Sequence, residues 1–169
     1  MIPISQYRFQ SARAFLAIAI TFFYFFSTSS AYAAKAWTIT ASNLVFGVYD
    51  YLDTPTLDIA TNVTIQVSGC EKNDRVNYRI TLSAGQGSLG ARILANGANS
   101  LNYNLFIDSA RSQIWGDGTA DSSFIAVNLT CSSSYSETHT IYGRIFPAPN
   151  GVPGSYSDPV ITVTLTHNK

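Results

Sequence analysis

The residues of this chain whose types and spacing suit chemistry begin with a glycine-rich segment. Residues 85–90 read Gly-Gln-Gly-Ser-Leu-Gly, which is the glycine spacing of a dinucleotide-binding loop. Such a loop also needs a helix that opens at its third glycine and an acidic residue about 20 positions further on. The sequence that follows is ARILANGANS, and Asp108 lies in an alternating pattern typical of a strand. We therefore interpret residues 85–90 as a surface hairpin loop and expect no small-molecule cofactor.

The other candidates for metal or acid–base chemistry are two histidines, two cysteines and scattered carboxylates. His139 and His167 lack the close spacing of a metal-binding pair, and Cys70 and Cys131 are too far apart to form a C-x-x-C motif. No G-x-S-x-G sequence marks a nucleophilic serine. Isolated aspartates are typical of turns, where the carboxylate bonds its own backbone. This role is assigned to Asp50, Asp53, Asp117 and Asp121. The sequence predicts neither a metal site nor an enzyme.

The low charge of the chain argues against nucleic-acid binding. Its formal net charge is zero, and charged residues make up 12% of its 169 residues. A nucleic-acid-binding surface needs a basic stripe, and the sequence contains none. Low charge with many Thr, Ser and Asn residues suits an extracellular β-protein that associates with copies of itself, because a near-neutral surface resists association poorly.

The elements that position these residues are expected to be β-strands. Seven segments alternate apolar and polar residues with a period of two, and β-branched and aromatic residues dominate them. They cover residues 43–50, 59–68, 76–83, 101–108, 124–131, 138–146 and 160–166. Turns rich in Gly, Asn, Ser and Pro separate them, and no convincing helical stripe is present between them. The pattern predicts one all-β domain with the strand number of an immunoglobulin-like sandwich.

The N-terminal residues 1–33 have the pattern of a cleaved secretory signal peptide. Two arginines supply the positive region, residues 15–26 supply the apolar region, and Ala-Tyr-Ala at 31–33 supplies the cleavage site. The apolar run is shorter than the roughly 20 residues that span a bilayer. We expect cleavage before Ala34, export of the protein, and a mature domain of residues 34–169.

Two cysteines, Cys70 and Cys131, lie in the exported part of the chain. An even number of cysteines in an oxidising compartment favours an internal disulfide. In the chain-entropy model a closed loop of about 60 residues stabilises the fold by roughly 4 kcal/mol. Two free buried thiols, or pairing with another chain, are the alternatives.

Arginines, aspartates and a tryptophan surround the turn at residues 115–119, which reads Trp-Gly-Asp-Gly-Thr. One interpretation makes the arginines ligand clamps and the tryptophan a platform for a sugar ring. The preferred interpretation is structural: arginine–aspartate pairs tie this turn to neighbouring strands, and the tryptophan anchors the core or its rim. The group comprises Arg92, Arg111, Arg144 and Trp115, with Asp108 and Asp117 as the expected acceptors.

Several segments, taken in order, form a recognisable pattern. They read LVFGVYD at 44–50, TIQVSGC ending at Cys70, YRITLSAG at 78–85, ARI at 91–93, LNYNLFID at 101–108, WGDGT at 115–119, IYGRI at 141–145, GSYSD at 154–158 and ITVTL at 161–165. Together they resemble the spore coat protein U domain family, which includes the pilin subunits of archaic chaperone–usher pili. The resemblance covers residues 43–165, nearly all of the expected mature chain.

This resemblance implies an incomplete immunoglobulin-like β-sandwich that lacks one strand and is completed by a donated strand. In the family a periplasmic chaperone lends a strand first, and an outer-membrane usher exchanges it for the N-terminal strand of another pilus subunit. A missing strand leaves an apolar groove and unpaired backbone groups, and an added strand satisfies both. We expect Phe46, Ile65, Ile161, Val163 and Leu165 to line this groove.

Two departures from the family pattern concern the N-terminal region. Family members often carry a cysteine upstream of the LVFG-like strand, whereas residues 34–43 have none, which leaves Cys131 as the available partner of Cys70. Only AKAWTITAS separates the expected cleavage site from this strand, so a donor segment built on Trp37 and Ile39 is short. A subunit with a weak donor segment accepts a neighbour without complementing one, which suits a minor or terminal position.

The sequence thus predicts an exported structural or adhesive pilus subunit, in a minor or terminal position, that supports surface attachment and biofilm formation. It is expected in the periplasm during assembly and at the cell surface afterwards, with the chaperone, the usher and other pilus subunits as partners. Two alternatives stay open. One is a self-contained secreted coat protein with all strands present, and the other is a carbohydrate-binding sandwich that uses Trp115 and nearby aspartates.

Overall fold

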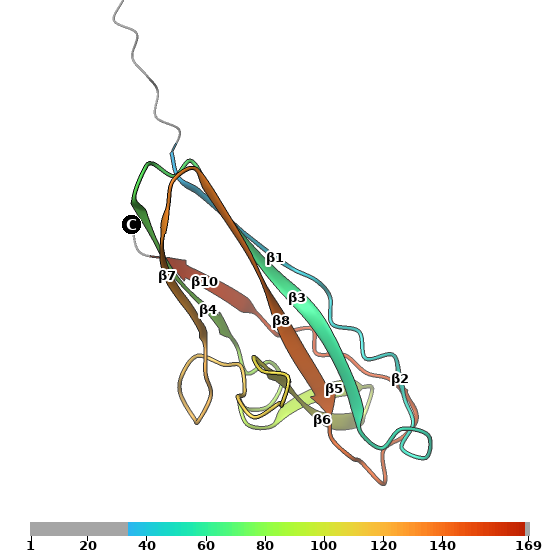
Figure 1. Cartoon of the computed structure of the whole chain (residues 1–169). Helices are drawn as coiled ribbons and strands as arrows, with labels where there is room; N and C mark the ends of the chain where they lie inside the picture. Colours follow the sequence, from blue (N-terminus) through green and yellow to red (C-terminus); the bar gives the residue numbers. More distant parts are fainter. Residues whose placement is uncertain (1–33, 168–169) are drawn as a thin grey trace, which may run out of the picture. The chain divides into compact units, whose positions relative to one another are not determined.

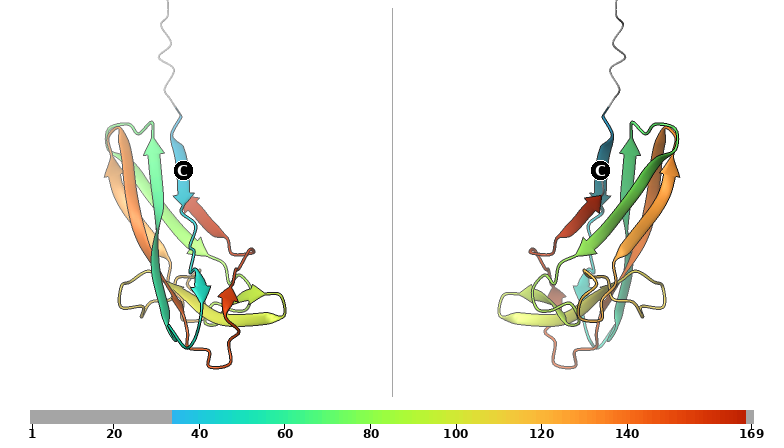
Figure 2. Two further views of the ribbon diagram at one scale, coloured as in Figure 1. Left: turned by 90° about the vertical axis from the view of Figure 1, so that its right-hand side faces the viewer. Right: turned by 90° about the vertical axis from the view of Figure 1, so that its left-hand side faces the viewer.

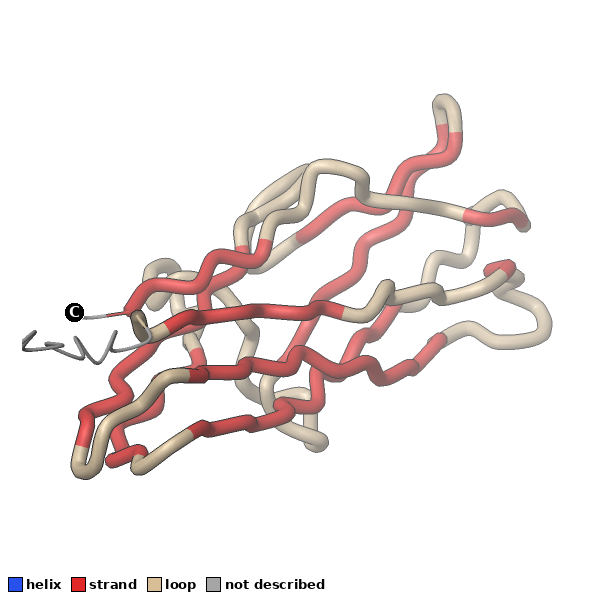
Figure 3. The backbone as a smooth tube through the Cα atoms, turned by 90° about the horizontal axis from the view of Figure 1, so that it is seen from above, coloured by secondary structure: helices blue, strands red, loops and turns tan. Residues whose placement is uncertain are grey.

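The alternating segments of the sequence form β-strands in this computed structural model, which describes residues 34–167. That part of the chain contains ten strands and no helix (Figure 3). The strands are β1 (Ala36–Ala41), β2 (Val48–Tyr49), β3 (Leu57–Ser68), β4 (Asp74–Leu82), β5 (Arg92–Asn96), β6 (Asn99–Phe106), β7 (Ile125–Cys131), β8 (Ser134–Ile145), β9 (Gly154–Ser155) and β10 (Val163–His167). Residues 34–167 hold no helix of the length and apolarity that a bilayer crossing requires. The predicted signal peptide at residues 1–33 lies outside the described residues.

Two main sheets and one short ribbon contain all ten strands (Figure 1). The larger sheet has the strand order β1-β3-β8-β6-β5, the smaller sheet has the order β10-β4-β7, and β2 pairs with β9. Every strand pair is antiparallel. The chain crosses between the main sheets after β3, β4, β6 and β7, as it does in a sandwich. The predicted all-β, immunoglobulin-like fold is confirmed.

Two long strands, β3 and β8, run along the centre of the larger sheet. The register pairs every residue of β3 with one of β8, from Leu57 opposite Ile145 to Ser68 opposite Ser134. Alternate residues of a strand point to opposite faces, so Val63 and Ile65 are buried while Gln66 is exposed. The hydrophobic pattern of the sequence therefore fixes which face of this sheet is covered.

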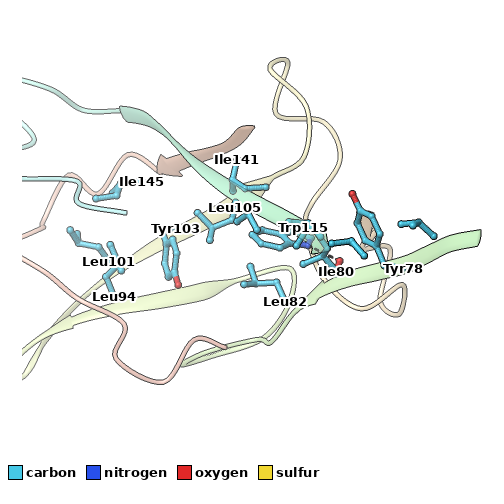
Figure 4. Close-up of a cluster of buried hydrophobic side chains, with 14 of the residues drawn as sticks. Tyr78, Ile80, Leu82, Leu94, Leu101, Tyr103, Leu105, Trp115, Ile141 and Ile145 are labelled. Atoms are coloured by element: carbon cyan, nitrogen blue, oxygen red, sulfur yellow. Dashed lines mark hydrogen bonds between the residues drawn. The ribbon is translucent and has the colours of Figure 1, made fainter. Parts of the chain in front are cut away.

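The space between the main sheets is filled by apolar and aromatic side chains from both of them (Figure 4). These are Val63, Ile65, Val67, Leu94, Leu101, Tyr103, Leu105, Ile141 and Ile145 from the larger sheet, and Val76, Tyr78, Ile80 and Leu82 from the smaller sheet. Trp115, from the loop between β6 and β7, is 2% exposed and donates its indole N–H to the carbonyl of Ile80 at 3.2 Å. Burial of each large apolar side chain stabilises the fold by about 1.5–3 kcal/mol.

The predicted strand at residues 43–50 is reduced to the two residues of β2, and this prediction was wrong for most of the segment. Gly47 lies at a φ of +81°, which interrupts an extended strand immediately before Val48. β2 pairs only with β9 among the described strands, so the rest of the segment has no partner to extend the ladder. Alternation of side chains along this segment therefore reflects partial burial rather than strand pairing.

Residues 85–90 contain the turn of a short hairpin, as predicted, and the segment also connects strands of different sheets. Gly87 and Arg92 form an antiparallel bridge, and Ser88 and Ala91 exchange backbone hydrogen bonds at 3.1 Å. The segment leaves β4 in the smaller sheet and enters β5 in the larger one. Gly87 has a φ of +101°, and a Cβ atom there would come within 2.4 Å of the Ala91 carbonyl oxygen. Glycine is thus required for a tight crossover. β5 was missed as a strand because only a short run separates this crossover from the turn at Gly97.

Candidate functional site

On one side of the sandwich both main sheets end in a strand with a free backbone edge. Among the described strands β1 pairs only with β3, and β10 pairs only with β4. β1 and β10 lie side by side at one end (Figure 2), and their aromatic side chains touch there. We call the surface formed by residues 37–46 on the β1 side and residues 161–167 on the β10 side the groove.

Half-buried apolar side chains line both walls of the groove. They are Trp37, Ile39, Leu44 and Phe46 on the β1 side, and Ile161, Val163 and Leu165 on the β10 side. Each packs on the core with one flank left open to solvent, and burying that flank is worth about 25 cal/mol per Å². The free edges of the two strands add N–H and C=O groups that have no ladder partner. The groove therefore combines apolar surface with unpaired backbone.

At one end the groove widens into a cavity of about 420 Å³. Its lining includes Phe46 and Ile161, together with Leu94, Tyr103 and Leu105. The Phe46 ring meets the Tyr103 ring edge-on, with the ring centroids 5.9 Å apart. A hollow of this size and apolarity accommodates one or two large apolar side chains of a bound segment.

At the other end two aromatic rings close the groove. The indole of Trp37 stacks on the imidazole of His167, with the ring centroids 4.5 Å apart and the planes 5° from parallel. The same indole meets the ring of Tyr78 edge-on at 6.1 Å. The two ends of the groove therefore differ, because one is filled by side chains of the chain itself and the other is hollow.

A buried arginine, Arg92, connects the segment between β4 and β5 to the loop between β6 and β7. It is 0% exposed and donates to the carbonyl oxygens of Ser83 at 2.8 Å and Trp115 at 2.8 Å. It also donates to the side-chain oxygen of Asn104, whose amide donates to the Leu89 carbonyl at 3.0 Å. Burial lowers the pKa of the Arg92 guanidinium. Backbone carbonyls and the Asn104 side chain, rather than the predicted aspartates, accept the hydrogen bonds of this cation.

A carboxylate, Asp158, connects the segment before β10 to the floor of the cavity. The phenol of Tyr103 donates to Asp158 at 2.8 Å, and the backbone N–H of Gln86 donates to the same oxygen at 3.1 Å. Burial, followed by this hydrogen bond to Asp158, raises the pKa of Tyr103 well above its ordinary value. Tyr103 is therefore held as a neutral donor.

The opposite side of the sandwich, between β7 and β8, has a different character. A hollow of about 550 Å³ lies there, and Glu137, Thr138 and His139 belong to its lining. The phenol of Tyr78 donates to Glu137 at 2.9 Å and lies 3.0 Å from Nε2 of His139. Burial, followed by the hydrogen bond to Glu137, raises the pKa of Tyr78. This side presents polar groups where the groove presents apolar ones.

The predicted pairing of arginines with Asp108 and Asp117 was wrong. Arg144 forms a two-point contact with Asp58 instead, at 2.7 Å for both bonds, and Arg111 lies 3.3 Å from the same carboxylate. The hydrogen bond from Arg144 lowers the pKa of Asp58. Asp108 and Asp117 lie in tight turns whose own backbone N–H groups saturate them, as the bonds from Ser112, Gln113 and Thr119 show.

The alternative of a sugar platform at Trp115 is contradicted by its burial. Its ring lies in the core and its single donor is used within the chain, so no face is left for a ligand (Figure 4). The preferred interpretation of Trp115, as a core anchor, is the one that its position supports.

The predicted disulfide is confirmed. Cys70 and Cys131 are bonded, with their Cα atoms 5.8 Å apart, and no free cysteine is present among residues 34–167. Cys70 follows β3 of the larger sheet and Cys131 ends β7 of the smaller one. The bond therefore joins the two sheets at one end of the sandwich. No three His, Cys, Asp or Glu side chains of the described residues gather as a metal site would require.

The residues expected to line the groove fall in different places. Phe46 and Ile161 flank the cavity, Val163 and Leu165 lie on β10, and Ile65 is 0% exposed in the core beneath. Sequence reasoning missed Leu44, Leu94, Tyr103, Leu105 and Tyr156. Tyr103 and Leu105 belong to an alternating segment and were recognisable as inward-facing, but nothing in the sequence indicated which inward residues lie at the open side.

The predicted donor residues, Trp37 and Ile39, lie in β1 of the chain's own sheet. All six residues of β1 are in register with β3, with Trp37 opposite Val67 and Ile39 opposite Ile65. Their side chains pack on the core from the β1 side of the groove. A donor role in a neighbouring molecule stays a prediction, and it requires β1 to leave this sheet.

Comparisons with known proteins agree on family and fold. The model of the spore coat protein U domain matches residues 24–164. A chain in the crystal structure of the CsuC–CsuE chaperone–tip adhesion subunit pre-assembly complex, from the archaic chaperone–usher Csu pili of Acinetobacter baumannii, is similar in structure with a TM-score of 0.51 and 16% sequence identity. The match covers 80% of the present chain and 40% of that one. No curated protein sequence matches significantly. The chain belongs to the spore coat protein U domain family.

Proposed function

We propose that this protein is an exported subunit of a chaperone–usher pilus, assembled by insertion of a donated β-strand into the groove between β1 and β10. The observation that carries the proposal is the groove itself, with two free strand edges above half-buried apolar side chains. The family, and the fold shared with a chain of a chaperone–subunit complex, support the same assignment. A periplasmic chaperone, an outer-membrane usher and other pilus subunits are the proposed partners.

Strand addition fits the groove better than small-molecule binding does. An inserted strand pairs its backbone with the edge of β10, while alternate side chains cover Val163 and Leu165. At the wide end, a large apolar side chain of the same strand enters the cavity between Phe46 and Ile161. One extended segment thus satisfies both the unpaired backbone and the open apolar surface.

We further propose a minor or terminal position in the pilus, with a role in surface attachment and biofilm formation. The segment that carries Trp37 and Ile39 is engaged in its own sheet, paired with β3 along all six residues of β1. A subunit in this state accepts a strand without giving one. The periplasm during assembly and the cell surface afterwards are the proposed locations.

The proposal is tested by the thermal stability of residues 34–169, produced by export to the periplasm so that the disulfide forms. The midpoint of unfolding, Tm, is measured with and without a synthetic peptide whose apolar residues alternate. A peptide of the same composition in scrambled order is the control. We expect the alternating peptide to raise Tm by several degrees and the scrambled peptide to leave it unchanged, because a ligand stabilises only the state that binds it.

A high Tm that neither peptide changes would contradict the proposal and favour a self-contained coat protein with a complete sandwich. As a positional check, Val163→Asp places a charge on the wall of the groove. We expect it to abolish the effect of the alternating peptide, whereas Thr164→Asp, on the opposite face of the same strand, leaves that effect intact.

A further inference from the structure

The aromatic contact at the closed end of the groove has a consequence for strand binding. We propose that the Trp37–His167 stack is a clasp that closes this end and thereby sets the length and register of the strand that the groove accepts. The inference rests on the proposed function, because it concerns the same groove. The inference specifies which part of the groove is open to a partner strand and which part is occupied by side chains of the chain itself.

The geometry of the rings leaves no room for a further layer. Their centroids are 4.5 Å apart and their planes are nearly parallel, so Trp37 and His167 are in direct contact across the gap between the two strands. Tyr78 supports the indole from the side of the smaller sheet, edge-on at 6.1 Å. An incoming side chain at this level meets an occupied position, whereas at the other end it meets the cavity beside Phe46.

The position of His167 on its strand determines how much of the groove stays open. Alternate residues share a face, so His167 follows Ile161, Val163 and Leu165 in one row. The first three are half-buried, whereas His167 is exposed and stacks on Trp37. His167 ends β10 and lies opposite Tyr78 in the register with β4. A strand that starts beside the cavity therefore passes three inward positions before it reaches the clasp, a length of about 17 Å or roughly five residues.

The clasp lies where a partner strand would otherwise continue. The free edge of β1 runs from Ala36 to Ala41, and Trp37 is near its beginning. Without the two rings, the edges of both strands would offer one more inward position. Extending a bound strand past Leu165 therefore requires the indole and the imidazole to separate. The binding free energy gained from the extension is reduced by the loss of this stacking contact.

The experiment compares peptides of different length on the exported chain, with affinity measured by calorimetry. The core peptide carries three apolar residues at alternate positions. Two longer peptides each add one polar and one apolar residue, one at the N-terminus and the other at the C-terminus, so that either strand direction is tested. The proteins are the natural sequence, His167→Ala, Trp37→Ala and, as a matched control, Thr166→Ala, which changes the outward face of the same strand.

We expect the natural sequence to bind all three peptides with the same affinity within about twofold. In His167→Ala, one of the longer peptides should bind about tenfold more tightly than the core peptide, which is the gain from one additional buried apolar side chain. Thr166→Ala should behave as the natural sequence does. His167 is exposed, so its replacement is not expected to disturb folding even if Trp37→Ala does.

Three results separate the possible failures. If the core peptide binds to none of the proteins, the proposed function fails. If the core peptide binds but a longer peptide already binds about tenfold better to the natural sequence, the clasp is overturned while the proposed function stands. If neither His167→Ala nor Trp37→Ala binds a longer peptide more tightly than the core peptide, the stack does not limit the strand. The clasp is then again overturned.

Discussion

At the scale of single residues, we expect the stability of the fold to depend most strongly on Arg92. Its guanidinium is fully buried and bonds to the carbonyls of Ser83 and Trp115 and to the side chain of Asn104. We predict that Arg92→Met lowers the free energy of unfolding by about 3 kcal/mol, because buried acceptors are left without a donor. Urea denaturation of the disulfide-bonded chain measures this change.

A second arginine provides the control for that prediction. Arg144 makes an equally close contact, with Asp58, but on the exposed face of the larger sheet. Solvent screens an exposed pair, so Arg144→Met should cost less than about 1 kcal/mol. Equal losses for the two variants would show that burial of Arg92 is not what makes it important.

Tyr103 gives a prediction about pH. Burial and the hydrogen bond to Asp158 raise the pKa of its phenol in the folded chain. In the unfolded chain the phenol titrates near pH 10. A pKa raised on folding stabilises the protein fully below the unfolded value, and this stabilisation is lost as the pH rises above about 10 toward the folded pKa. The urea midpoint should therefore stay level from about pH 8 to 10 and fall above that range.

The variant Tyr103→Phe isolates this contribution. It removes the titrating group and one hydrogen bond, so it should be less stable at neutral pH by about 1 kcal/mol. Above about pH 10 its midpoint should fall less steeply than that of the natural sequence. The pKa of Tyr78 is also raised, so both proteins should still lose some stability at alkaline pH. Identical alkaline profiles would contradict the assignment to Tyr103.

At the scale of elements, the sequence predicts strands well where a long ladder and one buried face coincide. β3 and β8 pair along their whole length, and their period of two is visible in the sequence. The prediction was wrong for most of residues 43–50, where Gly47 takes a positive φ value that periodicity does not reveal. Pairing to a distant partner, such as β2 with β9, is likewise absent from local pattern.

The candidate groove was predictable only in part for the same reason. Inward residues of β10 can be read from alternation, but the open side of a sandwich is set by which strand each sheet places at its edge. Trp37 and His167 are in contact although they lie far apart in the sequence, and no spacing rule connects them. Likewise two of the three acceptors of Arg92 are backbone carbonyls, which any residue supplies, so the side-chain types at Ser83 and Trp115 gave no signal.

At the scale of the whole molecule, β1 is paired within its own chain, with β3. Under the proposed function, this pairing decides whether the chain accepts a strand, donates one, or does both. A donor must release its strand, and β1 is held by six register pairs with β3 and by the packing of Trp37 and Ile39. An isolated peptide of residues 34–42 is not paired with β3, and it keeps the alternation of apolar and polar residues that is typical of a strand. The two forms of the same segment should therefore behave differently.

We predict that the free peptide of residues 34–42 raises the Tm of the intact chain, whereas intact chains do not exchange β1 with one another. The second part is measured by retention of untagged chain on a tagged copy, followed by light scattering of the eluate. If intact chains do form oligomers, and Trp37→Ser with Ile39→Ser abolishes them, β1 is a working donor and a terminal position is excluded. If only the peptide acts, β1 stays in its own sheet, and growth past this subunit needs a donor strand from elsewhere.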